Sequence, residues 1–124
     1  MMICFDWIFP EAARTLALRG AQIICHPSNL VMPYCQNSMY ARAIENRVFT
    51  ITANRTGTDM IGKESVSFTG GSVMLSPNGE YLSRASEDKE ELNIVEINPL
   101  DAKNKFINEK NNLFDERREM FYYR

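Results

Sequence analysis

The first 25 residues predict a strand end, a helix and a second strand, and this order limits the fold more than any other feature. Residues 1–5 are apolar and typical of the end of a buried strand. Pro10 and Glu11 suit the first turn of a helix, and Gly20 is a natural helix stop. The apolar run 21–25 is typical of a strand buried on both faces. This arrangement favours a layered α/β architecture with neighbouring strands parallel.

The rest of the chain continues to alternate between helix and strand patterns. A second helix is expected at residues 34–47, with Tyr40, Ile44 and Val48 as its apolar stripe. Residues 26–29 predict a turn at the carboxyl edge of the sheet, where ligands of α/β proteins bind. The other predicted elements are a strand at 48–53, an irregular loop at 55–71, a hairpin with strands 72–75 and 81–83, a strand at 92–97, and a last helix opened by Asn98-Pro99.

Length and charge exclude several classes of function. The 124 residues suffice for one domain with a real core and are too few for two. With 14 basic and 16 acidic side chains, the chain lacks the positive charge that nucleic-acid binding needs. No apolar stretch is long enough to span a bilayer, and the N-terminus does not resemble a signal peptide. Three cysteines do not form a secreted disulfide framework, so we expect a cytoplasmic protein.

Cys4 is the first candidate for chemistry. A thiol between a buried strand and the start of a helix can act as a nucleophile, because backbone N–H groups stabilise its thiolate. From chemistry alone, a role as a small core residue is favoured, since free cysteine is often buried. His26, the sole histidine, is expected to form local hydrogen bonds in its loop.

The other reactive side chains do not predict a site of their own. Four possible zinc ligands occur: Cys4, Cys25, His26 and Cys35. They lack a C-x-x-C pair, and adjacent Cys25 and His26 would point to opposite faces of a strand. Glu11 and Glu45 could be general bases, but helix dipole and charge pairing already explain them. We therefore expect neither a metal nor a cofactor.

A series of segments nevertheless follows one order along the chain. These segments are Cys4-Phe5-Asp6-Trp7-Ile8-Phe9-Pro10-Glu11, Arg19-Gly20-Ala21-Gln22-Ile23-Ile24, His26-Pro27-Ser28-Asn29, Ala41-Arg42-Ala43-Ile44-Glu45-Asn46-Arg47-Val48-Phe49, Ala53-Asn54-Arg55-Thr56-Gly57, Phe68-Thr69-Gly70-Gly71-Ser72 and Ser76-Pro77-Asn78-Gly79. Together they resemble the motifs of the nitrilase superfamily, the carbon–nitrogen hydrolases. The first segment resembles the family's nucleophile box, in which a cysteine precedes an aromatic-Pro-Glu sequence.

The resemblance implies an α/β fold, the C-terminal half of a nitrilase-type α-β-β-α sandwich, with residues 1–124 forming a partial hydrolase domain. It implies that Cys4 attacks an amide or nitrile carbon and that the backbone N–H of Phe5 lies in the oxyanion hole. Glu11, Glu45 and Asn54 match structural positions of the family. Amide and carbamoyl substrates are preferred to nitriles.

Ser28 and Asn29 are candidates for contacts with a small-molecule amide substrate. They belong to the segment that resembles the family's substrate-side loop, at the carboxyl edge of the sheet. Capping of the turn explains both residues as well.

The chain departs from the family before its cysteine. The family places a glutamate, a lysine and a second glutamate there, whereas only three residues precede Cys4. We therefore expect the chain alone to be poorly active, with the missing N-terminal half or a homo-oligomer as its partner. The aromatic tail Phe121-Tyr122-Tyr123 is compatible with such a contact. The alternative is a catalytically degenerate interaction module, and a thiol redox protein is disfavoured because no C-x-x-C occurs.

Overall fold

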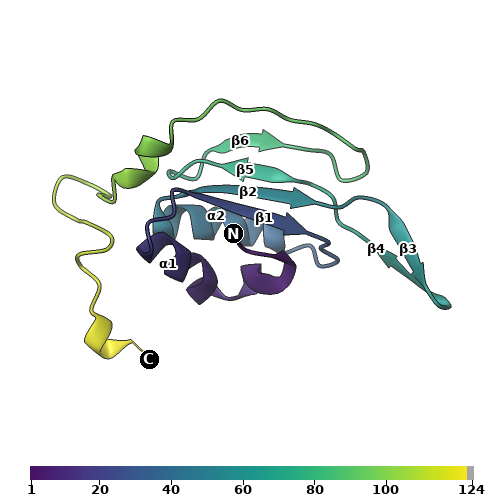
Figure 1. Cartoon of the computed structure of the whole chain (residues 1–124), viewed down its shortest axis with the longest axis horizontal. Coiled ribbons are helices and arrows are strands. Elements are labelled where there is room, and N and C mark those ends of the chain that lie inside the picture. The colour runs from purple at the N-terminus through teal and green to yellow at the C-terminus, as the bar shows by residue number, and fades with distance from the viewer. Residues whose placement is uncertain (123–124) are drawn as a thin grey trace.

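The computed structural model describes residues 1–122, and a four-stranded sheet in the order β1-β2-β5-β6 forms its centre (Figure 1). The sheet consists of the strands β1 (Ile23–Ser28), β2 (Phe49–Asn54), β5 (Val73–Leu75) and β6 (Tyr81–Arg84). Two helices pack against it, α1 (Pro10–Leu18) and α2 (Cys35–Asn46). Strands β1 and β2 are parallel and are joined by α2, whereas β2–β5 and β5–β6 are antiparallel. The predicted α/β class is confirmed.

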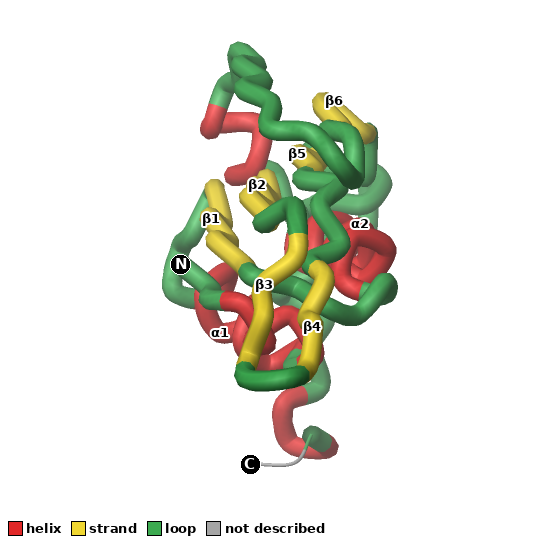
Figure 2. Tube along the Cα trace, turned by 90° about the vertical axis from the view of Figure 1, so that its right-hand side faces the viewer, coloured by secondary structure: helices red, strands yellow, loops and turns green. Residues whose placement is uncertain are grey.

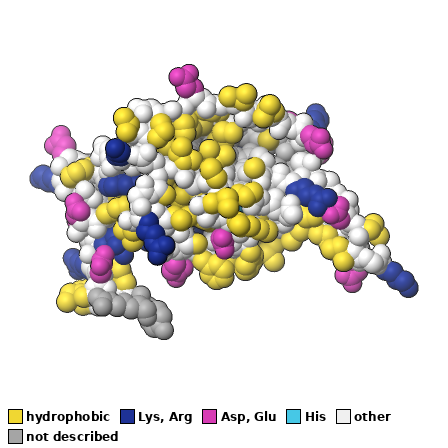
Figure 3. All heavy atoms as spheres, viewed as in Figure 1, with side chains coloured by type: hydrophobic (Ala, Val, Ile, Leu, Met, Phe, Trp, Pro, Cys, Tyr) yellow, Lys and Arg dark blue, Asp and Glu magenta, His cyan; other side chains and the backbone are white. Residues whose placement is uncertain are grey.

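Both helices lie on the same face of the sheet (Figure 2). The strand register places Ile24, Thr50 and Leu75 next to one another on that face, and all three are fully buried. The opposite face carries residues such as Ile51 and Met74, which are only half-buried. Hydrophobic side chains gather over the strands (Figure 3). The sheet therefore has one face packed against α1 and α2 and one apolar face that neither α1 nor α2 covers (Figure 2).

Several predicted elements are confirmed. Helix α1 begins at Pro10, and the chain leaves it at Gly20, whose φ is +91°. The predicted hairpin is formed by β5 and β6. Its turn requires Gly79, where φ is +84° and a Cβ atom would lie 2.7 Å from side-chain atoms of Ile44 and Tyr40. Glycine is thus needed both for the turn and for the close approach of α2.

Two predictions near the N-terminus are wrong. Residues 26–28 do not form a turn but continue β1 to Ser28. Proline is a common turn signal, yet Pro27 lies on an edge strand, where the missing N–H costs little. Residues 1–5 do not end a strand: the Met2 N–H donates one hydrogen bond to the Cys25 carbonyl (3.0 Å), and Cys4–Ile8 forms the 3₁₀ helix η1.

Three predictions further along the chain also need correction. The expected loop 55–71 contains a second hairpin, β3 (Thr58–Ile61) and β4 (Glu64–Ser67), which projects from the main sheet (Figure 1). The segment 92–97 is not a strand. Leu92 and Ile94 are each 86% exposed, and no strand within residues 1–122 pairs with them. The last helix is only a 3₁₀ turn, η2 (Pro99–Lys103), although the Asn98 side chain does cap it.

Only one member of the predicted stripe of the second helix is buried: Val48 is fully buried, but it lies beyond the end of α2 at Asn46. Met39 and Ala43 are fully buried, whereas Tyr40 and Ile44 are 40% and 39% exposed. The small Ala43 lets the helix approach the sheet closely, so the larger neighbours lie at its side. Tyr40 there stacks on Tyr81 of β6, with 6.2 Å between ring centroids.

The C-terminal segment leaves η2 and follows an irregular path to a short 3₁₀ helix, η3 (Glu119–Phe121). Its Lys105 ammonium donates to the carbonyls of Asn46 (2.9 Å) and Arg47 (2.8 Å) at the end of α2. Burial lowers the pKa of Lys105 to about 8. Phe121 and Tyr122 are exposed, and Tyr123 of the predicted aromatic tail lies outside the described residues. No helix within residues 1–122 has the length and apolar character needed to cross a membrane.

Candidate functional site

Cys4 is the first residue of η1 and lies beside the chain that follows β1. Its Sγ is 3.9 Å from the carbonyl oxygen of Asn29, and its side chain is half-buried. Its φ is +45°, in the left-handed region that non-glycine residues rarely adopt at a cost of about 1–2 kcal/mol. Strained residues of this kind concentrate at functional sites. The backbone therefore marks Cys4 as an unusual position independently of its thiol.

His26 contacts the backbone of Cys4 rather than its sulfur. The ring is fully buried, and Nε2 lies 2.8 Å from the Cys4 carbonyl oxygen. Nδ1 lies 3.2 Å from Oγ1 of Thr52, on the neighbouring strand. Burial lowers the pKa of His26. The expected local hydrogen bonding of His26 thus reaches across the fold to Cys4, and the ring is not placed as a base for the Cys4 thiol.

The three thiols have different environments. Cys35 on α2 is fully buried, and burial raises its pKa to about 12. Cys25 is exposed on the helix-free face of the sheet. Cys4 is intermediate in exposure. Reactivity that followed exposure alone would therefore rank Cys25 first and Cys35 last.

Polar contacts hold η1 at both ends. At its start, a carboxylate oxygen of Asp6 accepts a hydrogen bond from the Ile3 N–H at 2.9 Å. At its end, Nε and Nη2 of Arg42 both donate to the Trp7 carbonyl at 3.3 Å. Arg42 is in turn held by Glu45, with 3.2 Å between Nη1 and Oε1. Glu45 therefore orients Arg42 and makes no hydrogen bond to the Cys4 thiol.

Asn54 ends β2 and joins two loops near the site. Its side-chain oxygen accepts from the Leu30 N–H at 2.9 Å, and its side-chain nitrogen donates to the Gly70 carbonyl at 2.7 Å. The same nitrogen lies 3.0 Å from Oγ1 of Thr69. The residue thereby fixes the loop that carries the Asn29 carbonyl.

Of the remaining sequence candidates, Phe5 and Ser28 lie near Cys4 and Glu11 does not. Phe5, half exposed, follows Cys4 in η1, and its ring meets Trp7 and Phe9 edge-on. The Ser28 hydroxyl lies 3.0 Å from Nε2 of His26, so Ser28 is within the same network as Cys4. Glu11 is exposed in the first turn of α1, away from this network.

The sequence indicates neither the contact of His26 with Cys4 nor that of Arg42 with η1. Pro27 suggests a loop at His26, although the two-residue spacing of His26 from Ile24 predicts the same buried face of a strand. Arg42 lies off the predicted stripe of α2, and nothing in its local pattern points to the Trp7 carbonyl. Within residues 1–122 no group of three or more histidine, cysteine or carboxylate side chains is arranged to hold a metal.

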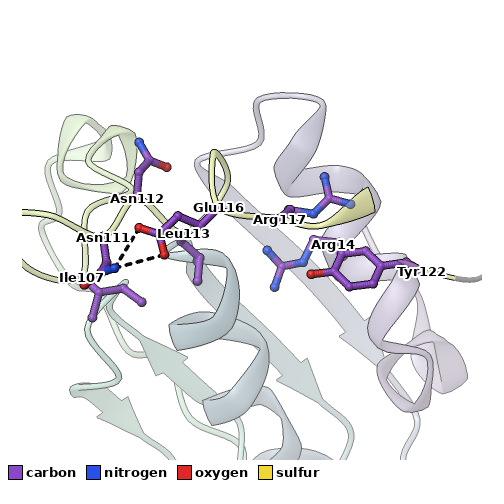
Figure 4. Close-up of a pocket in the computed structure, with 8 residues that line it drawn as sticks. All are labelled: Arg14, Ile107, Asn111, Asn112, Leu113, Glu116, Arg117 and Tyr122. Carbon is purple, nitrogen blue, oxygen red and sulfur yellow. Dashed lines mark hydrogen bonds between the residues drawn. The ribbon is translucent and has the colours of Figure 1, made fainter. Parts of the chain in front are cut away.

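A hollow of about 380 Å³ lies elsewhere, between α1 and the C-terminal segment (Figure 4). Arg14 of α1 reaches into it from one side, and Asn111 pairs with Glu116 on the other, at 2.9 Å. Its lining includes Arg117 and Tyr122 but none of the residues around Cys4. Arg14 also donates to the Glu45 carbonyl, so this region supports the α1–α2 contact.

Comparison with known proteins identifies close relatives of the sequence. The model of the family described as "Carbon-nitrogen hydrolase" matches residues 1–104. A nitrilase of Pyrococcus abyssi is 51% identical over 124 residues, which are 100% of this chain and 46% of that protein. The chain spans about half or less of the length of the curated relatives it matches.

Solved structures agree with this match. A carbon–nitrogen hydrolase from Helicobacter pylori G27 superposes with a TM-score of 0.67 at 30% identity, covering 72% of this chain and 36% of that one. A mutant amidase from Nesterenkonia sp. AN1, with glutamine in place of a glutamate, superposes with a TM-score of 0.60 at 34% identity, covering 69% of this chain and 32% of that one. That structure shows the acetamide moiety of fluoroacetamide added covalently at the active-site cysteine.

Proposed function

The chain belongs to the carbon–nitrogen hydrolase family, and on this premise we propose that it cleaves non-peptide amides or carbamoyl compounds through a thioester on Cys4. The observation that carries this proposal is the backbone at the start of η1. Cys4 has a φ of +45°, and within residues 1–122 no group accepts a hydrogen bond from the adjacent Phe5 N–H. A thiol on a strained backbone suits a nucleophile, and an adjacent N–H without an acceptor suits a donor to the oxyanion.

The chemistry takes two steps. The Cys4 sulfur bonds to the carbonyl carbon, and the negative charge that develops on the carbonyl oxygen is stabilised by the Phe5 N–H. The carbon–nitrogen bond then breaks, and the proton from the thiol leaves with the amine. Water attacks the thioester, releases the carboxylic acid and restores the thiol. The acetamide adduct on the active-site cysteine of the Nesterenkonia amidase shows that the cysteine of that protein is nucleophilic, which supports a nucleophilic role for Cys4.

Proton transfer needs a group that the described site does not supply. The hydrogen bond of the Cys4 Sγ within residues 1–122 goes to the Asn29 carbonyl, and His26 faces the backbone. General acid–base catalysis contributes about 10²–10⁴-fold to enzyme rates. We therefore propose that the family's glutamate and lysine come from another segment or chain, and that residues 1–124 alone turn over amides poorly.

The partner and the location that we propose follow from one surface and from the thiols. Neither α1 nor α2 covers the apolar face of the sheet, and a face of this kind suits the missing part of the domain or a second copy. Cys4, Cys25 and Cys35 are all free thiols, which suits a reducing cytoplasm.

Acetylation by limiting 4-nitrophenyl acetate tests the role of Cys4. The sulfur–carbon bond forms, nitrophenolate leaves with its electron pair, and the thiol proton passes to solvent, so no acid is needed for the leaving group. We expect mass spectrometry to find the acetyl group on Cys4 ahead of Cys25, although Cys25 is more exposed. The Cys25→Ser variant should keep this reactivity and Cys4→Ser should lose it. Acetylation of Cys25 first would contradict the proposal and favour an interaction module.

A further inference from the structure

His26 makes three contacts from a fully buried position. Nε2 lies 2.8 Å from the Cys4 carbonyl oxygen, and Nδ1 lies 3.2 Å from the Thr52 hydroxyl. The Ser28 hydroxyl lies 3.0 Å from the same Nε2 and 3.4 Å from the His26 carbonyl. Residues separated by 22 positions in the sequence thus meet at the backbone of the nucleophile.

These contacts select one form of the ring. A carbonyl oxygen only accepts hydrogen bonds, so Nε2 must carry the hydrogen that it directs at Cys4. Burial keeps the ring neutral, and a neutral imidazole has a single N–H, so Nδ1 accepts from the Thr52 hydroxyl. The Ser28 hydroxyl then serves Nε2 as a second acceptor and gives its own hydrogen to the His26 carbonyl.

The bond to the Cys4 carbonyl also determines where the Phe5 N–H points. Both groups belong to one planar peptide unit, and in the trans form the C=O and N–H bonds point in opposite directions. The chain contains no cis peptide within residues 1–122. Anchoring the oxygen to a buried ring therefore turns the N–H away from the core. A hydrogen bond to the oxygen also polarises the N–H and makes it a stronger donor.

We propose that His26 is a positioning residue that orients the Cys4–Phe5 peptide so that its N–H faces the developing oxyanion. This inference rests on the proposed function, because it assigns a support to the same oxyanion donor. His26 itself touches neither the thiol nor the reacting carbon.

Two matched substitutions test it. His26→Gln retains an amide N–H near the position of Nε2, whereas His26→Asn can place one only near Nδ1. The readout is the rate of Cys4 acetylation by 4-nitrophenyl acetate divided by the rate of its alkylation by iodoacetamide, which develops no oxyanion. We expect His26→Asn to lower this ratio about tenfold, the effect of one weakened hydrogen bond, and His26→Gln to stay within about twofold of wild type.

Cys35 provides the control for folding, because it is fully buried and stays unmodified in a folded variant. A variant in which the reagents modify Cys35 is unfolded, and its rates are not used. In that case the tautomer of His26 in the wild-type protein, measured by NMR, tests the proposal. His26 is the sole histidine, so its ¹⁵N signals need no separate assignment, and we expect a protonated Nε2 and a bare Nδ1.

The outcomes separate the two proposals. The opposite tautomer, an equal loss in both variants or no loss in either would overturn the positioning role while leaving a reactive wild-type Cys4 in place. Preferential acetylation of Cys25 in the wild type would instead remove the proposed function itself.

Discussion

The strained backbone of Cys4 predicts an unusual order of stabilities for two substitutions. Cys4→Ala and Cys4→Gly both remove the thiol, but only alanine keeps a Cβ atom at a φ of +45°. Relief of the left-handed strain favours the glycine variant by about 1–2 kcal/mol. The greater freedom of glycine in the unfolded chain opposes this by about 0.5–1 kcal/mol. The glycine variant should therefore be more stable by roughly 0.5–1 kcal/mol.

Urea unfolding followed by the fluorescence of the single tryptophan measures this difference. Trp7 is 5% exposed and lies in the core, so its emission reports loss of the fold. Ala53→Gly in β2 is the matched control, because Ala53 is exposed and does not have a positive φ. The control should lose about 0.5–1 kcal/mol, the opposite sign. If Cys4→Gly is less stable than Cys4→Ala, the backbone of Cys4 is not strained and the reasoning fails.

Three further predictions use other parts of the structure. The Asn54→Asp substitution keeps the oxygen that accepts from the Leu30 N–H but places a carboxylate oxygen against the Gly70 carbonyl. It should lower the free energy of unfolding, measured by urea titration, by about 2–3 kcal/mol. The control Asn37→Asp, at an exposed position, should lower it by less than about 0.5 kcal/mol. Because burial lowers the pKa of His26, the unfolded chain binds the extra proton first, and the free energy of unfolding in urea titrations should fall as the pH drops below 6.5. The His26→Gln variant should lack this pH-dependent loss. In an ammonia-release assay, residues 1–124 alone should turn over simple amides at least about 100-fold below the typical 10 per second of enzymes.

Elements with strong local signals could be predicted from the sequence. Proline at the first turn and glycine after the last define α1, and the turn 76–79 defines the β5–β6 hairpin. Elements that depend on their neighbours could not. The segment 92–97 has the right alternation for a strand but no pairing partner within residues 1–122. Among residues 1–122, β3 and β4 pair only with each other and bury little, so their sequence lacks the alternation of a half-buried sheet.

The candidate site divides in the same way. The motif around Cys4 predicts a nucleophile through its resemblance to a family, and the structure adds a backbone conformation that no motif states. The role of His26 depends on the register of β1 and on the course of residues 1–4 beside it. Local sequence patterns predict neither feature correctly. Pro27 favours a turn although it lies in β1, and residues 1–4 are joined to β1 by one hydrogen bond from Met2 and do not pair with it as a strand. Sequence patterns therefore locate the thiol but not its support.

The support of η1 explains how the strained backbone of Cys4 can persist. Two side chains hold carbonyls of this short helix: His26 holds that of Cys4, and Arg42 holds that of Trp7. They come from β1 and α2, the elements that form the core, so η1 cannot relax without disturbing the contact between sheet and helix. The few hydrogen bonds of a short 3₁₀ helix do not offset the free-energy cost of the left-handed backbone at Cys4. The strain at Cys4 is thus maintained by packing elsewhere, and weakening either contact should let the thiol and the Phe5 N–H move apart.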